Sequence, residues 1–240
     1  MRSGTSSLVM KTTSKLVVAV VLVLIAIVAW IMVFETGGRL AGTATGPTPL
    51  AAVEVREFEG KDLSSVSDFR ENSIKGPQHI NESDYRLTIT GLTNRTVVST
   101  YHDVLSRHPR YSKVVTLFCV EGWDITILWE GILVRDLLSD AGFDPRANTV
   151  IFTAHDGYTT SFPLVYLTGR DIIMAYRMNN VTLPAERGYP FALVAEDKWG
   201  YKWIKWIEKI ELSDNPDYRG YWEQRGYSNT GDLDKNLFSR

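Results

Sequence analysis

Residues 114–123 of this chain, VVTLFCVEGW, contain its single cysteine, Cys119, between an apolar run and a Glu-Gly-Trp sequence. An apolar run rich in β-branched residues predicts a buried strand, and the glycine predicts a turn directly after it. A lone thiol cannot form an internal disulfide, and a strand end can present it to a bound cofactor. A free cysteine in such a run is also commonly a small buried hydrophobic residue, so both interpretations of Cys119 stay open at this level.

Short strands and short helices are expected on either side of this stretch. The expected strands are 85–90, closed by Gly91, and 114–120, 149–154, 172–177, 191–195 and 203–212. The expected helices are one capped by Ser99 or Thr100 that runs through Leu105, and one over 133–141 that ends at Gly142. Asn179-Asn180 is expected to form a hairpin turn. This pattern predicts a mixed α+β domain and not a doubly wound sheet.

An apolar segment near the N-terminus predicts a membrane anchor. Residues 16–34 contain no charged residue, and a helix of this length can cross the hydrocarbon layer of a bilayer. Arg2, Lys11 and Lys15 precede it and the first later charge is Glu35, so the positive side, and hence the cytoplasmic side, is the N-terminus. A cleaved signal peptide is the alternative, but its apolar region is usually shorter than this one.

These features divide the chain into four parts. We expect a cytoplasmic N-terminus over 1–15, a transmembrane anchor over 16–34, a flexible Gly, Ala, Thr and Pro tether over 35–52, and one exported domain over 53–240. The expected location is therefore the cell membrane, single-pass, with the domain on the extracytoplasmic side. Beyond the anchor, 23 Lys and Arg face 28 Asp and Glu, a formal charge of −5 that does not suggest nucleic-acid binding.

Several common site motifs are absent from the sequence. There is no His-Glu-x-x-His, no second cysteine, no phosphate-binding Gly-x-x-x-x-Gly-Lys and no Gly-x-Ser-x-Gly, and the four histidines lack ligand spacing. Two clusters mix functional residue types in expected turns, namely 118–124 continuing to 129–131, and 197–207. The second cluster alternates cations with aromatic rings around Gly200, which suits a flat heteroaromatic ligand with an anionic group. A membrane-proximal aromatic belt or a strand face with snorkelling lysines is the alternative.

Six ordered motifs between Tyr85 and Tyr227 give the chain a family resemblance. They are 119–123 (CVEGW), Trp129-x-Gly131 with 137–142, the 156–158 turn (DGY), 188–190 (GYP), 200–207 (GYKWIKWI), and 220–223 (GYWE) with Gly226-Tyr227. In this order they resemble the oxidoreductase molybdopterin-binding domain of the sulfite oxidase family. The pattern is most similar to its small single-domain members, which include the periplasmic methionine-sulfoxide reductase catalytic subunit.

The resemblance implies an enzyme with a Mo-molybdopterin cofactor and a sulfite-oxidase-type fold. Cys119 would be the thiolate ligand of molybdenum, a role that suits a soft anionic sulfur. The cofactor would move one oxygen atom and two electrons while the protein supplies orientation and electrostatics. Gly200, Tyr201 and Lys202 match the turn that holds the pterin and its phosphate, and Thr153 lies near a position that contacts the cofactor in relatives.

The chain also departs from the family pattern. Relatives read His or Asn, then Gly-x-Pro-x-Arg, where this chain has Arg187 and then 188–192 with Ala192 in place of the arginine. Either Arg187 has taken over anion pairing, or cofactor affinity is reduced or lost. The second case defines the alternative function, a degenerate member that acts as a non-catalytic extracytoplasmic binding module.

The resemblance implies a class of substrate and a type of electron partner, but it identifies neither molecule. The substrate class is a small sulfite- or sulfoxide-type molecule, and the direction of the reaction stays open. The chain has no Cys-x-x-Cys-His haem-attachment motif, so a membrane haem or quinone-linked subunit is the expected electron partner. Trp123, Asp156 and Tyr158 either line the pocket or serve turn formation and packing.

Overall fold

The computed structural model describes residues 22–27 and 52–238. Residues 22–27 are helical, and the rest of the predicted anchor and nearly all of the predicted tether lie outside the described residues. Within the described parts of the chain, no helix is both long enough and apolar enough to cross a membrane. Residues 51–240 form one compact unit, which the following paragraphs describe by itself.

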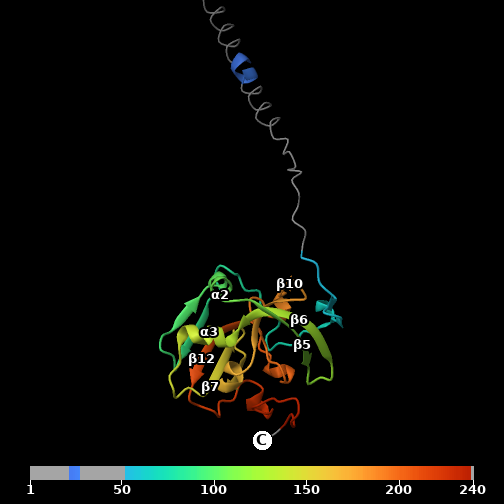
Figure 1. The fold of residues 1–240 in the computed structure, drawn as a ribbon. Coiled ribbons are helices and arrows are strands. Elements are labelled where there is room, and N and C mark those ends of the chain that lie inside the picture. Colours follow the sequence, from blue (N-terminus) through green and yellow to red (C-terminus); the bar gives the residue numbers. More distant parts are fainter. Residues whose placement is uncertain (1–21, 28–51, 239–240) are drawn as a thin grey trace, which may run out of the picture. The chain divides into compact units, whose positions relative to one another are not determined.

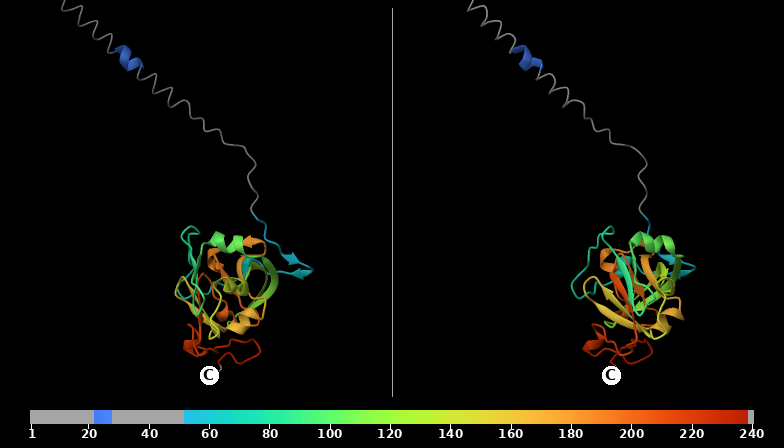
Figure 2. Two further views of the ribbon diagram at one scale, coloured as in Figure 1. Left: turned by 60° about the vertical axis from the view of Figure 1, so that its left-hand side comes forward. Right: turned by 90° about the vertical axis from the view of Figure 1, so that its left-hand side faces the viewer.

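Two five-stranded sheets form the framework of this unit (Figures 1 and 2). The first sheet has the order β10-β9-β6-β5, with β11 also paired to β9; its strands are β5 (Tyr111–Phe118), β6 (Asp124–Leu133), β9 (Ile173–Met178), β10 (Val181–Thr182) and β11 (Ala192–Val194). The second has the order β4-β3-β12-β7-β8; its strands are β3 (Leu87–Gly91), β4 (Val97–Ser99), β7 (Thr149–Ala154), β8 (Thr159–Pro163) and β12 (Ile207–Ser213). The β12–β3 pair is parallel, whereas β12 and β7 are antiparallel, so the second sheet is mixed.

Short helices and turns connect the strands. Three α-helices lie in the unit: α2 (Tyr101–Arg107), α3 (Val134–Ala141) and α4 (Leu164–Thr168). The remaining elements are a small hairpin of β1 (Glu57–Phe58) and β2 (Lys61–Asp62) and the 3₁₀ turns η1 (Val66–Asp68), η2 (Ala185–Arg187), η3 (Gly200–Lys202) and η4 (Glu223–Arg225). α3 contacts both β6 and β3, so this one helix joins the two sheets.

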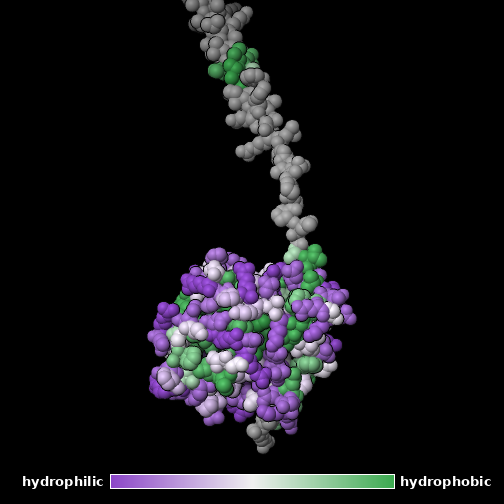
Figure 3. Space-filling view, viewed as in Figure 1, coloured by the Kyte–Doolittle hydropathy of each residue, from purple (hydrophilic) through white to green (hydrophobic). Residues whose placement is uncertain are grey.

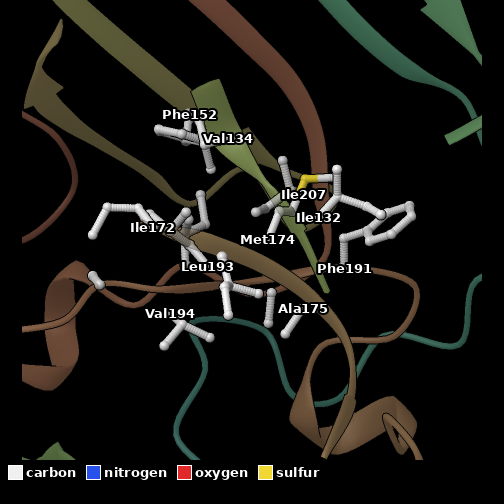
Figure 4. Packing of buried hydrophobic residues seen from close by; sticks show 14 of the residues in the cluster. Ile132, Val134, Phe152, Ile172, Met174, Ala175, Phe191, Leu193, Val194 and Ile207 are labelled. Atoms are coloured by element: carbon white, nitrogen blue, oxygen red, sulfur yellow. The ribbon is translucent and has the colours of Figure 1, made fainter. Parts of the chain in front are cut away.

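The apolar faces of the two sheets share one core. Figure 4 shows Ile132 and Met174 of the first sheet close to Ile207 of the second, and Phe152 of the second sheet beside Val134 of α3. Each of these side chains is fully buried. Removing such side chains from water is the main favourable contribution to folding. At the surface, hydrophilic residues dominate the face seen in Figure 3, with small apolar groups between them.

The structure confirms the mixed α+β architecture. Thr100 caps α2 as predicted, because its side chain accepts from the Asp103 amide while the Asp103 carboxylate accepts from the Thr100 amide. Gly142 ends α3, and Asn179 and Asn180 both have positive φ in the hairpin between β9 and β10. These local sequence signals predict the structure correctly because each residue forms its turn or cap with backbone groups only a few residues away.

Three sequence interpretations need correction. Strand β6 was not predicted, and residues 129–131 lie inside it and not in a turn, because Gly131 allows close approach to β9. Strand β8 was also not predicted, since a Thr-Thr-Ser sequence carries little apolar signal. The predicted strand over 203–212 begins only at Ile207, because residues 200–206 form a turn and loop that reach a cavity.

Candidate active site

Cys119 lies at the junction between β5 and β6. The Cys119 amide donates to the Trp123 carbonyl at 2.8 Å, and the Gly122 amide donates to the Cys119 carbonyl at 3.1 Å. Gly122 has φ of +82°, a conformation that glycine adopts without steric cost. The Glu-Gly-Trp sequence therefore closes a tight turn that fixes the cysteine backbone, and the Cys119 side chain is 7% exposed.

The thiol faces a cavity of about 500 Å³. Aromatic side chains from well-separated parts of the chain form much of its wall: Trp123, Trp129, Tyr158, Trp203, Trp206 and Tyr227. A large concave site that combines aromatic walls with polar groups is typical of a cofactor or small-molecule site. Cys119 is therefore not plain core filling, because its side chain borders a space large enough for a ligand.

The irregular segment 69–74 lines one side of this cavity. Phe69 contacts Trp123 and Trp129 edge to face, with ring centroids 6.2 and 6.0 Å apart. The Asn72 side-chain amide donates to Cys119 Sγ at 3.8 Å. The segment therefore contributes both packing and a side-chain hydrogen bond to the sulfur.

The pKa of the Cys119 thiol is raised above its ordinary value. Burial is the main cause, because it disfavours the thiolate, and the Glu121 carboxylate adds to the effect through charge repulsion. Hydrogen bonds from the backbone amides of Glu121 and Val120 and from Asn72 act in the opposite direction. A cation placed against the sulfur would act in the opposite direction and favour the thiolate.

Two partly buried cations border the cavity next to one carboxylate. Lys205 Nζ donates to Glu71 Oε1 at 2.9 Å and to the Glu186 carbonyl at 3.1 Å. Arg187 donates to the Phe69 carbonyl at 2.8 Å, and its guanidinium lies 5.0 Å from the centre of the Phe69 ring. Burial lowers the pKa of both cations. Burial alone would raise the pKa of Glu71, but the hydrogen bond and the charge of Lys205 outweigh it and lower that pKa.

Ala192 and Lys205 lie on the same wall. A Cβ atom placed on Gly188 would be 3.0 Å from the Cβ atoms of both residues, so the glycine permits their close packing. The Lys205 side chain therefore begins close to the position where the resembled family has an arginine. Positive charge is present at this wall although Ala192 carries none.

The turn η3 contacts the cysteine backbone directly. A Cβ atom on Gly200 would lie 3.3 Å from the Phe118 carbonyl oxygen and 3.4 Å from Cys119 Cα. Trp199 and Phe118 form an isolated parallel bridge at the same place. Tyr201 lines the cavity and donates its hydroxyl to the Ser228 carbonyl at 2.6 Å. Gly200 and Tyr201 thus join Cys119 and Arg187 in one site.

Two predicted site residues lie apart from the cavity wall. Thr153 is in β7, opposite Lys209 on one side and Thr159 on the other. The Lys202 side chain is 0% exposed, and its ammonium donates to the Ser161 carbonyl, to Glu223 Oε1 and to the Asn229 carbonyl. All three N–H groups of Lys202 are therefore used within the protein.

The sequence interpretation missed three polar residues of this site. Lys205 was part of the quoted aromatic and basic cluster, but nothing in the sequence distinguished it from Lys202. Arg70 is an arginine that the sequence offers as a candidate for anion binding, and it does line the cavity, whereas Glu71 and Asn72 had no signal, because an irregular segment shows no periodicity. In the part of the chain that the structure describes, no group of three His, Cys, Asp or Glu residues could hold a metal ion.

Comparison with known proteins gives a family match. The family model described as "Oxidoreductase molybdopterin binding domain" matches residues 74–222, more than half of the chain. The chain is 29% identical over 157 residues to "Uncharacterized oxidoreductase YuiH" of Bacillus subtilis, covering 65% of this chain and 78% of that protein. It is 31% identical over 160 residues to "Putative protein-methionine-sulfoxide reductase subunit YedZ1" of Azospira oryzae, covering 65% and 60%. With "Sulfite oxidase" of Gallus gallus, the identity is 28% over 190 residues, covering 66% and 41%.

A solved structure has a similar fold. The sulfane dehydrogenase SoxCD of Paracoccus pantotrophus superposes with a TM-score of 0.58 at 21% identity, covering 74% of this chain and 56% of that chain. The chain therefore spans most of one curated relative and about half of the others. At this level of identity, the structural match describes the fold alone.

Proposed function

Because this chain belongs to the oxidoreductase molybdopterin-binding domain family and carries its Mo-molybdopterin cofactor, we propose that it reduces a neutral sulfoxide-type substrate outside the cytoplasm. The observation that carries the proposal is Cys119 at the wall of an aromatic cavity that also holds Arg187 and Lys205. When bound, the cofactor supplies transfer of one oxygen atom with two electrons.

The residues at the cavity fit this cofactor. Cys119 offers one soft sulfur to the metal, and Gly200 permits close backbone approach beside it. Ser73 Oγ is a buried polar atom at the cavity, beside the Glu71 carboxylate. Arg187 and Lys205 would hold the phosphate of the pterin, and we propose that Lys205 replaces the arginine that Ala192 lacks.

The charge of the cavity supports a neutral substrate. Its charged lining consists of three cations and four carboxylates: Arg70, Arg187, Lys205, Glu71, Glu121, Asp156 and Glu186. Lys205 is paired with Glu71, and Glu121 lies two residues from the thiolate ligand. Such a lining does not favour an anion like sulfite, whereas aromatic walls suit a small organic sulfoxide. Two relatives are named for methionine-sulfoxide reductases, which agrees with this choice.

The first experiment measures the metal. The chain is produced in a host that makes the cofactor, and molybdenum is quantified in the native protein, in Cys119→Ser and in the control Lys209→Met, whose side chain is exposed on β12. We expect about one molybdenum per chain in the native protein and the control, and a large loss in Cys119→Ser. Absence of molybdenum from the native protein would favour the non-catalytic binding module.

The second experiment separates the substrates. With reduced viologen as the electron source, the native protein should reduce methionine sulfoxide, and it should oxidise sulfite poorly with ferricyanide. Glu71→Gln removes one negative charge beside Lys205 and should improve sulfite turnover relative to sulfoxide turnover. Efficient sulfite oxidation by the native protein together with no sulfoxide reduction would overturn the choice of substrate.

We also propose a membrane location for this activity. The uncharged segment 16–34 and the cations before it support a single-pass anchor with the domain on the extracytoplasmic side. A membrane haem or quinone-linked subunit would then supply electrons, since the enzyme itself holds one redox centre. Protease treatment of intact spheroplasts should cleave the domain, and protection of the domain would contradict this orientation.

A further inference from the structure

A C-terminal segment beyond the family match holds the turn behind the active-site cysteine. We call residues 223–232 the clamp segment; it follows residue 222, where the family match ends. Four of the five residues from 198 to 202 contact it. Lys198 pairs with Asp232, the Trp199 amide donates to the Gly231 carbonyl at 2.9 Å, Tyr201 donates to the Ser228 carbonyl, and Lys202 donates to the Asn229 carbonyl at 3.0 Å.

The centre of the clamp is a fully buried ion pair. Lys202 Nζ lies 2.6 Å from Glu223 Oε1, and both side chains are 0% exposed. Thr160 donates its hydroxyl to the same oxygen at 2.8 Å. Gly231 closes over Lys202, because a Cβ atom there would be 2.5 Å from Lys202 Cγ. Breaking a buried pair by removing one partner is costly, so this contact strongly defines where the clamp segment sits.

The fifth residue of the same stretch, Gly200, faces the other way. It packs against the Phe118 carbonyl and Cys119 Cα, and the neighbouring Trp199 bridges to Phe118. The stretch 198–202 is thus held by the clamp segment on one side and supports the cysteine turn on the other. A displacement of the clamp segment would move the support of Cys119.

We infer that Glu223, Lys202 and Asp232 are positioning residues that set the environment of Cys119 through the turn 198–202. Lys202 acts here as a tie between three chain segments and does not pair directly with a cofactor anion. The inference rests on the proposed role of Cys119 for its catalytic meaning. The predicted effect on the accessibility of the Cys119 thiol does not depend on the cofactor, so it can be tested in the cofactor-free protein.

The test measures how fast iodoacetamide alkylates Cys119 in the cofactor-free, full-length chain. Intact mass reports this reaction without ambiguity, because Cys119 is the single cysteine. The variants are Asp232→Asn and Glu223→Gln, and the matched control is Asp234→Asn, an exposed acid of the same loop. A hydrogen bond to a charged group shifts a local opening equilibrium about tenfold or more, so we expect alkylation to accelerate about tenfold in both variants. The control should match the native protein.

A double variant guards against simple loss of folding. Lys202→Met combined with Glu223→Leu removes both charges at similar volume, which commonly preserves stability. We expect the double variant to recover the melting temperature that Glu223→Gln loses. Cys119 should still be alkylated faster than in the native protein, because the hydrogen bonds from Lys202 to the Ser161 and Asn229 carbonyls are missing. Alkylation at the native rate in folded Asp232→Asn or in the double variant would overturn the inference.

The absorption spectrum of the molybdenum-bound protein provides a second measurement. In the molybdenum-bound enzyme, the same variants should shift the sulfur-to-metal charge-transfer absorption, and the control should not. If the native chain binds no molybdenum but Cys119 is still alkylated faster in the variants, the proposed function is wrong and the inference about the clamp segment is supported. If the molybdenum-bound variants show the native spectrum and the cofactor-free variants show the native alkylation rate, the inference is wrong and the proposed function is unaffected.

Discussion

At the residue scale, Cys119 combines a buried thiol with a neighbouring carboxylate. Burial and Glu121 both raise the thiol pKa, while backbone amides and Asn72 partly offset them. A free thiolate is therefore disfavoured at this position and becomes favourable only against a cation. The same cysteine can therefore look like core filling from its sequence neighbours and still border a cavity large enough for a ligand.

The pH dependence of Cys119 alkylation should reveal this environment. In the cofactor-free protein, the alkylation rate should reach half its maximum at a higher pH than in the urea-unfolded chain, because the folded thiol loses its proton less readily. Glu121→Gln should move this midpoint to lower pH by removing charge repulsion. Glu59→Gln, which changes an exposed distant carboxylate, should leave it in place. A native midpoint at or below that of the unfolded chain would contradict the assigned environment.

At the scale of elements, local sequence signals predicted caps and turns better than strands. Thr100 with Asp103, Gly142 and the Asn179-Asn180 turn each satisfy nearby backbone groups, so their effect is contained in a few residues. Strand β6 was missed because its Gly131 looked like a turn residue. Only its partner β9 shows why a glycine is needed there.

Gly131→Ala should destabilise the sheet that carries Cys119. A Cβ atom at this position would lie 2.2 Å from the Met174 carbonyl oxygen, so β6 and β9 would have to separate. Overpacking of this kind costs about 1–3 kcal/mol, measurable as a lower free energy of unfolding in urea. Unchanged stability would show that the two strands are further apart than the structure has them.

Thr100→Ala should weaken α2 alone. Loss of the side-chain cap costs about 1 kcal/mol. Thr100→Ser keeps the hydroxyl that accepts from the Asp103 amide and should retain most of the stability. Equal losses in both variants, measured by urea unfolding, would mean that the methyl group and not the cap is responsible.

At the scale of the whole molecule, the C-terminal segment contributes stability that depends on pH. Burial would raise the pKa of Asp232, but hydrogen bonds from Lys198 and Lys235 outweigh this and lower it to about 2. A depressed carboxyl pKa stabilises the fold at neutral pH, and this contribution is lost as pH falls from about 4 through about 2. The difference from the ordinary value corresponds to about 2 kcal/mol.

Asp232→Asn should therefore lower the free energy of unfolding by about 2 kcal/mol at pH 7, with the difference from the native protein disappearing near pH 2. Urea unfolding between pH 7 and pH 2 measures both curves, and Asp234→Asn provides the matched control. A difference that stays constant over this range would show that the carboxylate charge is not the cause.

The sequence by itself determined the α+β class, the main caps and turns and the family, because each rests on short-range patterns or on motifs in linear order, and it named Cys119 as the candidate metal ligand. Tertiary structure alone decided which cations reach the cavity. Lys202 and Lys205 lie three residues apart in the same basic and aromatic cluster, yet Lys202 is enclosed by Glu223 and the clamp segment while Lys205 borders the cavity beside Glu71. The reason is that burial and pairing depend on chain segments far away in sequence, here 69–74 and 223–232, which carry no local signal of where they pack.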